Sequence, residues 1–281
     1  MPAPTLPSEN PVAAVVNPSG HAIEFDNVSI AFDEKVVLER ISFQLAHGET
    51  KAIFGVAGSG KSTLLKLAIG LLRPDSGRIF VLGEEITHMP EQELFELRRR
   101  VGIVFQESAL FDSLKVYENV AFRLMEEKIS AEEVEQRVRE VLRFVELERT
   151  YDMFPSELSG GMRRRVAIAR AIITKPEVLL YDSPTGGLDP VTSYTIIELI
   201  VKQRDVSKTS ALMVTHRLQD AFTMATHEFD KATNQMIALP KGKRGEVLMS
   251  FLILRDGKVI FDGDAQQLAA SRDDYIREYI S

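Results

Sequence analysis

Residues 55–63 read GVAGSGKST, which fits the phosphate-loop pattern G-x-x-x-x-G-K-[ST]. Glycines in such a loop let backbone N–H groups turn toward phosphate oxygens, where side chains would obstruct the approach. The lysine of the pattern reaches the β- and γ-phosphates, and the hydroxyl that follows it ligates Mg²⁺. The loop therefore predicts that the protein binds a nucleoside triphosphate with Mg²⁺. The candidate phosphate-binding residues are Gly55, Gly58, Ser59, Gly60, Lys61, Ser62 and Thr63.

The segments on either side of the loop favour the same interpretation. Residues 51–54 read as a short buried strand that enters the loop, and residues 63–68 open a helix. The positive N-terminal end of that helix would face the bound phosphates. A purely structural glycine-rich turn is the alternative, and the strand and helix around the loop disfavour it.

The composition of the chain limits the class of protein. Its 281 residues suffice for one large α/β domain, or for one domain with an inserted lobe. The net charge of -7 disfavours a nucleic-acid partner. The absence of cysteine excludes disulfides and thiolate metal sites. Because no apolar run approaches the length of a membrane-spanning helix, any work at a membrane would need a partner. Residues 1–20, rich in Pro, Ala, Ser and Asn, are expected to form a disordered tail.

From residue 21 the chain alternates predicted strands and helices, which favours a parallel sheet with helices on both faces. Residues 108–175 are predicted to be a mainly helical insertion, and residues 226–250 an irregular insertion with a basic run at 241–244. One helix of the first insertion should bury Val134, Val138, Val141, Leu142 and Val145. The predicted strands are 22–28, 39–45, 78–82, 101–105, 178–181, 211–214, 251–254 and 258–261, and helices are predicted at 92–100 and 191–203.

Further motifs lie outside the phosphate loop. Residues 158–162 read LSGGM, and the N–H groups and hydroxyl at the start of the helix that follows would form a second phosphate clamp. Asp182 ends a buried apolar strand, where an unpaired carboxylate is costly and Mg²⁺ offers compensation. The run 163–165, three arginines, is predicted to be a solvated helix face. The other motifs are Gln106 after the strand 101–105, GLD at 187–189 and His216 after the strand 211–214.

In this order the motifs resemble those of the ATP-binding cassette (ABC) ATPases, over about residues 22–226 and the final hairpin. The resemblance implies an α/β fold: a P-loop NTPase core with a mostly parallel, RecA-like sheet, an antiparallel β-subdomain and an inserted α-helical subdomain. It implies ATP as the nucleotide. Ser62, Gln106 and Asp182 would hold Mg²⁺, while Phe32 would stack on the adenine. An ordinary core aromatic is the alternative for Phe32.

The resemblance also implies partners. Ser159, Gly160 and Gly161, with Asp189, would close on the γ-phosphate held by a second copy, so that ATP joins a homodimer. The sequence 105–120 and Met162, where most transporters carry Gln, resemble the ATPase subunits of bacterial phospholipid-trafficking systems of the Mla or toluene-tolerance type. Those subunits pair with a separate permease and a lipid-carrying MCE-domain protein. The implied location is therefore cytoplasmic, on the inner face of the cell membrane through the permease.

One position departs from the family pattern. Where the family places a glutamate that polarises the attacking water, this chain has Ser183, whose hydroxyl is not basic at neutral pH. We expect weakened hydrolysis, with Gln106, Ser183 and His216 as the catalytic residues. Glu107, or Asp189 across the dimer, is an alternative source of a carboxylate. An engineered serine, an ATP-binding switch with little turnover, and a soluble ABC ATPase not tied to transport are further alternatives.

Overall fold

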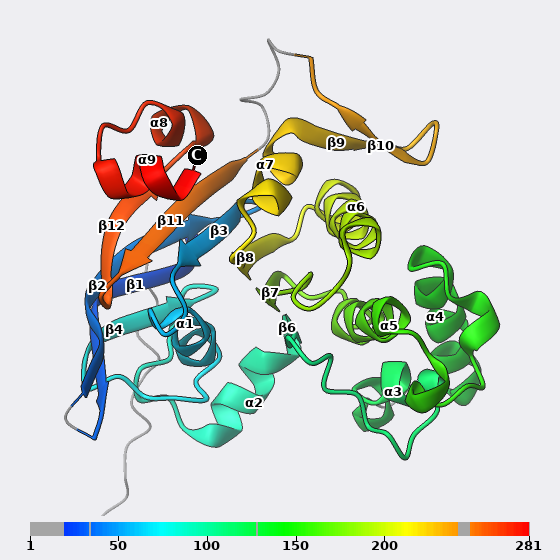
Figure 1. Cartoon of the computed structure of the whole chain (residues 1–281). Coiled ribbons are helices and arrows are strands. Elements are labelled where there is room, and N and C mark those ends of the chain that lie inside the picture. The colour runs from blue at the N-terminus through cyan, green and yellow to red at the C-terminus, as the bar shows by residue number, and fades with distance from the viewer. Residues whose placement is uncertain (1–19, 34, 128, 241–247, 281) are drawn as a thin grey trace, which may run out of the picture.

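The computed structural model describes residues 20–33, 35–127, 129–240 and 248–280. A six-stranded sheet forms its centre, in the order β12-β11-β3-β8-β7-β6 (Figure 1). The strands from β11 to β6 pair in parallel, and β12 pairs antiparallel with β11. The carboxyl ends of the parallel strands therefore share one edge of the sheet, where ligands of open α/β sheets bind. The strands are β3 (Thr50–Gly55), β6 (Val101–Val104), β7 (Val178–Asp182), β8 (Ser210–Val214), β11 (Met249–Arg255) and β12 (Lys258–Gly263).

The central strands are apolar on both faces because each face is covered. Side chains of β7 alternate between two hydrophobic cores: Val178 and Leu180 belong to one, Leu179 and Tyr181 to the other. Strands β3, β8 and β11 divide their side chains between the same two cores. Strands buried on both faces read as continuous apolar runs, which is the pattern that the sequence shows.

One face of this sheet carries a four-stranded antiparallel sheet and two helices. The order of the antiparallel sheet is β2-β1-β4-β5. Strand β1 continues four residues beyond its predicted end at Val28, because register shifts around Asn27 break the alternation on which the prediction rested. The elements are β1 (His21–Phe32), β2 (Lys35–Ala46), β4 (Ser76–Val81), β5 (Glu84–Glu85), α1 (Lys61–Ala68) and α2 (Glu91–Arg99).

The other face is covered by helices, three of which come from the segment between β6 and β7. In α4 the predicted apolar face is confirmed: Val138, Val141, Leu142 and the following Val145 are buried, and Val134 is half-buried. The helices are α3 (Val116–Ala121), α4 (Ala131–Phe144), α5 (Gly160–Ile172), α6 (Pro190–Ser207), α7 (Leu218–Thr226), α8 (Ala265–Ala269) and α9 (Asp274–Ile280), with 3-10 turns at Leu124–Glu126, Glu148–Thr150 and Pro155–Glu157. The predicted fold class is confirmed.

The prediction of an irregular segment at 226–250 is wrong for its first half. Strands β9 (His227–Asp230) and β10 (Gln235–Ala238) form an antiparallel hairpin that packs beside α6 (Figure 1). Met236 is the buried residue of β10, so the strand lacks a repeated apolar pattern that sequence reasoning could detect. The basic run 241–244 and residues 1–19 of the predicted tail lie outside the described residues.

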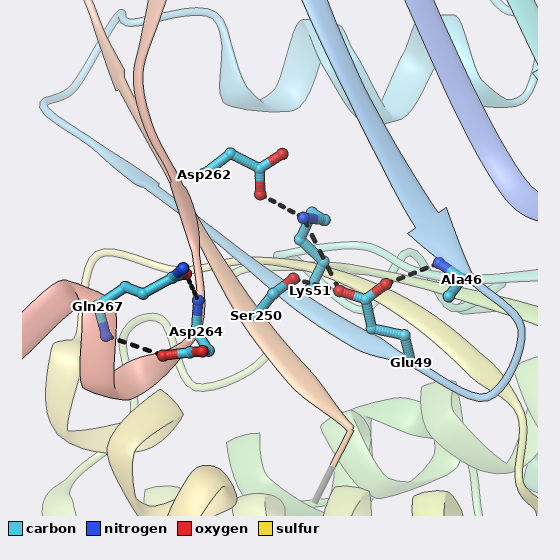
Figure 2. Close-up of polar contacts among 7 residues, drawn as sticks. All are labelled: Ala46, Glu49, Lys51, Ser250, Asp262, Asp264 and Gln267. Carbon is cyan, nitrogen blue, oxygen red and sulfur yellow. Dashed lines mark hydrogen bonds and ion pairs between the residues drawn. The ribbon is translucent and has the colours of Figure 1, made fainter. Parts of the chain in front are cut away.

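A buried charge network fixes the start of β3, the strand that leads into the phosphate loop. The Lys51 ammonium lies between the carboxylates of Asp262 and Glu49 (Figure 2). Glu49 also accepts hydrogen bonds from the Ala46 N–H (2.6 Å) and the Ser250 hydroxyl. Nearby, Asp264 caps α8 and its N–H donates to the Gln267 side chain. The network joins β3 to the C-terminal hairpin, and it compensates a lysine side chain that is only 4% exposed.

Removing one partner should expose the cost of burying that lysine. We expect Asp262→Ala to lower the free energy of unfolding by about 2–4 kcal/mol, because the ammonium loses its nearest carboxylate. Adding Lys51→Met in the same chain should recover most of the loss. Urea denaturation measures both. Lys258→Met, which breaks an exposed pair with Glu39, is the matched control and should change stability by less than about 1 kcal/mol. A loss for Asp262→Ala no larger than for this control would contradict the interpretation.

Candidate nucleotide site

The phosphate loop joins the end of β3 to α1, and its glycines are required for different reasons. Gly55, Gly58 and Gly60 all have positive φ, at 151°, 79° and 95°. A Cβ at Gly60 would lie 2.5 Å from Leu38 Cδ2, and one at Gly55 would lie 2.5 Å from the Leu254 carbonyl oxygen. Nothing lies within 4 Å of a Cβ built at Gly58, so there the left-handed backbone alone favours glycine.

Lys61 places a positive charge over this loop. Its Nζ donates to the carbonyl oxygens of Gly55 and Val56, each at 2.8 Å, and lies 3.3 Å from Ser59 Oγ. Burial holds the pKa of Lys61 below its ordinary value, and the nearby charge of Asp182 opposes this shift only in part. The ammonium and the N-terminal end of α1 thus lie side by side at the phosphate loop. Both carry positive charge, which favours binding of a polyphosphate anion.

Ser62 and Asp182 meet although 120 residues separate them in the chain. Ser62 lies in the first turn of α1 and Asp182 ends β7, and the Ser62 hydroxyl donates to Asp182 Oδ1 at 3.3 Å. Hydroxyl and carboxylate oxygens are the ligands that Mg²⁺ prefers, and Mg²⁺ bound with a nucleotide takes only one or two protein ligands beside phosphate oxygens. The part of the chain that the structure describes holds no cluster of three or more His, Asp or Glu able to bind a metal. By the chemistry of its hydroxyl and carboxylate oxygens, the Ser62–Asp182 pair fits a magnesium ion that binds together with the nucleotide.

The segment after Asp182 brings Ser183 and Gln106 to the same edge. Ser183 has a left-handed backbone (φ 46°), is buried, and donates its N–H to the Val214 carbonyl oxygen at 2.9 Å. A Cβ at Gly186 would lie 3.7 Å from Gln106 Cγ, so the Gln106 side chain packs against this segment. Asp189 ends the segment and caps α6, and its hydrogen bond from the Thr192 hydroxyl lowers the pKa of Asp189. The structure thus brings Gln106 to the segment that follows Ser183, and this segment leads to Asp189.

The LSGGM segment lies elsewhere, at the start of α5. Ser159 caps this helix by accepting the Met162 N–H at 3.3 Å, and Ser159 and Gly160 are exposed. A Cβ at Gly161 would lie 2.4 Å from Thr192 Cγ2, so this glycine lets α5 pack closely against the start of α6. Helices α5 and α1 lie on opposite faces of the sheet (Figure 1). The LSGGM segment and the phosphate loop thus belong to helices on different faces of the same sheet.

Two predicted residues stand apart from these contacts. Phe32 is the last residue of β1 and its side chain is 43% exposed, which argues against the core alternative. His216 follows β8 at the carboxyl edge, is exposed, and makes no hydrogen bond within the described residues. Both side chains are exposed at the surface.

The prediction of a solvated face at 163–165 is wrong for Arg164. Its side chain faces inward and is 4% exposed, and its guanidinium donates to the carbonyl oxygens of Phe105 (2.9 Å) and Gly186 (3.4 Å). Sequence reasoning also missed Asp220, a buried carboxylate that accepts the Thr185 hydroxyl. No pattern marks either residue, because arginine runs and single acidic residues are usually solvated.

The sequence profile of the ABC transporter family matches residues 38–186, more than half of the chain. This stretch contains the phosphate loop, Gln106, the LSGGM segment and the Asp182–Ser183 turn. The chain belongs to the ABC transporter family. It is an ATPase of the ABC type and binds ATP with Mg²⁺.

Curated ABC relatives are similar over most of this chain. The chloroplast protein TRIGALACTOSYLDIACYLGLYCEROL 3 of Arabidopsis thaliana is 35% identical, covering 94% of this chain and 74% of its own length. The methionine import ATP-binding protein MetN 2 of Bacillus cereus is 34% identical, covering 92% and 72%. The intermembrane phospholipid transport system ATP-binding protein MlaF of Haemophilus influenzae is 33% identical, covering 89% and 87%. MetN 2 and MlaF are both named as ATP-binding proteins, the first for methionine import and the second for intermembrane phospholipid transport.

Solved ABC structures agree with the fold. The ATP-binding cassette MJ0796, solved as a dimer in a post-hydrolysis state bound to ADP and Pi, superposes with a TM-score of 0.71 at 29% identity, covering 86% of this chain and 98% of that one. CbiO1 of Clostridium perfringens, part of the ABC transporter complex cbiONQ, superposes with a TM-score of 0.75 at 27% identity, covering 92% and 94%. The fold thus extends over nearly the whole described chain.

The position of Lys61 predicts a large effect on nucleotide affinity. Hydrogen bonds to charged groups contribute about 1.5–3 kcal/mol, so Lys61→Ala should weaken ATP binding at least about 10-fold. Titration of the Mg²⁺ complex of a fluorescent ATP analogue measures the change. Lys66→Ala is the control, because Lys66 lies exposed on the same helix. Equal affinities for the two variants would contradict the assignment of Lys61.

Proposed function

We propose that this chain is the ATP-hydrolysing subunit of a phospholipid transporter and works as a homodimer beneath a separate permease. The observation that carries the hydrolytic part is the meeting of Ser62 and Asp182 beside the phosphate loop, close to Lys61. Hydrolysis there is attack of water on the γ-phosphorus with ADP as leaving group. Lys61 and the start of α1 would stabilise the charge that develops on the phosphate oxygens. When bound, Mg²⁺ neutralises phosphate charge, and Ser62, Asp182 and Gln106 would hold it.

The attacking water would be positioned by Gln106, Ser183 and His216. Ser183 and Gln106 lie at one edge of the sheet, and exposed His216 follows the neighbouring strand β8. None of these is a carboxylate, so water would be oriented rather than deprotonated by a strong base. The adenine ring would stack on the exposed side chain of Phe32.

The homodimer is supported by the place of the LSGGM segment. Because α5 and α1 lie on opposite faces, Ser159, Gly160 and Gly161 would serve the ATP of a second copy (Figure 1). Beside Asp189, Val191 and Tyr194 are 78% and 51% exposed, although both are large and mainly apolar. An apolar pair at that position suits a surface covered by the second copy. The cassette MJ0796 is itself a dimer.

A separate apolar patch supports the permease. Phe111, Phe122 and Met125 are exposed on the segment after Gln106 and around α3, and the rings of Phe111 and Phe122 lie 4.6 Å apart. The Arg170 guanidinium lies 5.9 Å from the Phe111 ring centroid. No helix within the described residues is long and apolar enough to cross a membrane. We therefore place the chain at the inner face of the cell membrane, held there by coupling helices of the permease on this patch.

Phospholipid as the cargo rests on relatives and on Met162. MlaF is named for intermembrane phospholipid transport, and the Arabidopsis relative carries the name of a glycerolipid. Other relatives are named for methionine or for sulfate and thiosulfate. Met162, at the fifth position of LSGGM, favours the first group, and with it an MCE-domain lipid-binding partner.

The cargo can be tested on the complete transporter. The complex that contains this chain, purified from its native membrane and reconstituted into liposomes, should move a fluorescent phospholipid when ATP is added. Methionine and sulfate should leave its ATPase rate unchanged. The same complex with Lys61→Ala is the control for ATP dependence. Stimulation by methionine or sulfate without phospholipid movement would contradict the lipid proposal and leave the ATPase assignment intact.

Ser183 predicts slow turnover and is the observation that favours a switch as the second candidate. General-base positioning contributes about 10²–10⁴-fold to rate, so Ser183→Glu should raise phosphate release by about 10-fold or more, or about 1.4 kcal/mol of barrier. ATP affinity should hardly change, because the new carboxylate would act on water. Steady-state phosphate release from the purified chain measures the rate.

Light scattering with Mg²⁺ and ATP provides the control for assembly. Wild type and Ser183→Glu should form the same ATP-dependent dimer, and a monomer in both would contradict the homodimer. No gain in rate from a wild type that already turns over quickly would show that another group is the base. No hydrolysis by either form within the full complex would favour the switch.

A further inference from the structure

The backbone between Ser183 and Leu188 is held by side chains from two helices that lie far apart in the sequence. Within the segment, the Gly186 N–H donates to the Ser183 carbonyl oxygen (2.9 Å), and the Leu188 N–H donates to that of Thr185 (3.2 Å). These turns leave the Thr185 side chain and the carbonyl oxygen of Gly186 to contacts from elsewhere. Those contacts come from α5 on one side and from the start of α7 on the other.

Arg164 holds the segment from α5. Its guanidinium joins the carbonyl oxygen of Phe105, which directly precedes Gln106, to that of Gly186. No carboxylate lies within ion-pair distance of this arginine among the described residues, although the charges of Glu107 and Asp182 act on it. Its buried Nε has no hydrogen-bond partner there. Burial of a guanidinium without a carboxylate in direct contact is costly, so packing stability alone does not account for it. Its contacts link the LSGGM helix to Phe105, the residue before Gln106, and to the turn after Ser183.

Asp220 holds the segment from α7. The Asp220 carboxylate is 5% exposed, accepts the Thr185 hydroxyl, and lies 3.5 Å from Arg217 Nε. Arg217 directly follows His216 and donates to Ser193 Oγ (2.8 Å). That hydroxyl donates to the Leu188 carbonyl oxygen at 3.4 Å. The residues after His216 are therefore connected to both Thr185 and Leu188.

We propose that Arg164 and the Asp220–Thr185 pair are positioning residues for ATP hydrolysis, which hold the 183–188 backbone from helices α5 and α7. The segment carries Ser183 at one end and leads to Asp189 at the other. Its orientation therefore determines the positions of both residues relative to the bound nucleotide. Arg164 connects the segment to the LSGGM helix. Asp220 connects it to Arg217, the residue next to His216. The inference deepens the proposed hydrolytic site and rests on it.

Two pairs of variants separate positioning from packing. Thr185→Val keeps the shape of the side chain and removes the hydroxyl, whereas Thr185→Ser keeps the hydroxyl. Arg164→Met keeps the aliphatic stem, and Arg164→Lys keeps the charge but cannot span both carbonyl oxygens. Since small displacements at a reacting centre cost up to about 100-fold, Thr185→Val and both Arg164 variants should lower kcat by about 10- to 100-fold. KM for ATP and the thermal unfolding midpoint should stay near wild type, and Thr185→Ser should keep most of kcat.

A double-variant cycle tests the pair itself. Asp220→Asn and Thr185→Val act on the same contact, so the double variant should lose little more kcat than the single ones. If the fold-losses in kcat of the two single variants multiply in the double variant, the two residues act independently. That result would overturn the proposal that Asp220 and Thr185 act as a pair. Equal losses in kcat, ATP affinity and thermal midpoint for all variants would show a packing role and overturn the proposal.

Hydrogen exchange gives a readout that needs no turnover. Peptides covering residues 183–188 of the full chain should exchange faster in Thr185→Val and Arg164→Met than in wild type, with and without the Mg²⁺ complex of ATP. Unchanged exchange in both variants would overturn the proposal, whatever the wild-type rate. If wild-type protein fails to hydrolyse ATP but the two variants exchange faster than wild type, the hydrolytic function would be contradicted. The attachment of residues 183–188 to α5 and α7 would still be supported.

Discussion

Parallel pairing of β3, β8 and β7 is the constraint on which the site depends. Parallel strands deliver their carboxyl ends to one edge, so the phosphate loop after β3, Asp182 at the end of β7 and His216 after β8 emerge together. The hydrogen bond from Ser62 to Asp182 exists only because of this arrangement. The two hydrophobic cores keep the sheet apolar on both faces, and the buried network around Lys51 fixes the opposite end of β3.

A second constraint is the close approach of α5 to α6. Gly161 lies against Thr192 with no room for a Cβ, and Gly160 lies near Leu188. Gly161 thus has a packing role within one chain, in addition to the phosphate role proposed in the dimer, whereas a Cβ at Gly160 would meet Leu188 at an ordinary 3.6 Å. The same approach brings Arg164 within reach of the Gly186 carbonyl oxygen. The LSGGM helix is consequently attached to the segment that carries Ser183.

Features that depend on residues close together in the sequence were predictable, and features that depend on contacts between distant residues were not. The phosphate loop, the strand before it and the helix after it were predictable because glycine conformations and apolar runs are local properties. The apolar face of α4 was predictable because helical spacing repeats along the chain. The extension of β1 was not, since its bulges disturb the alternation, and the β9–β10 hairpin was not, since Met236 is the buried residue of β10. Arg164 looked solvated because its acceptors are carbonyl oxygens of distant residues, Phe105 and Gly186.

The sequence by itself determined the class of fold, the nucleotide and the departure at Ser183, because each follows from residue types at fixed short spacings. Tertiary structure decided which of these residues meet. It put Ser62 against Asp182 and Gln106 against Gly186, and it put the LSGGM helix on the face of the sheet opposite α1. It also decided that Arg164 and Asp220 are buried beside the turn after Ser183. Such pairings depend on strand order and on helix packing across the sheet, which no local pattern of residues encodes.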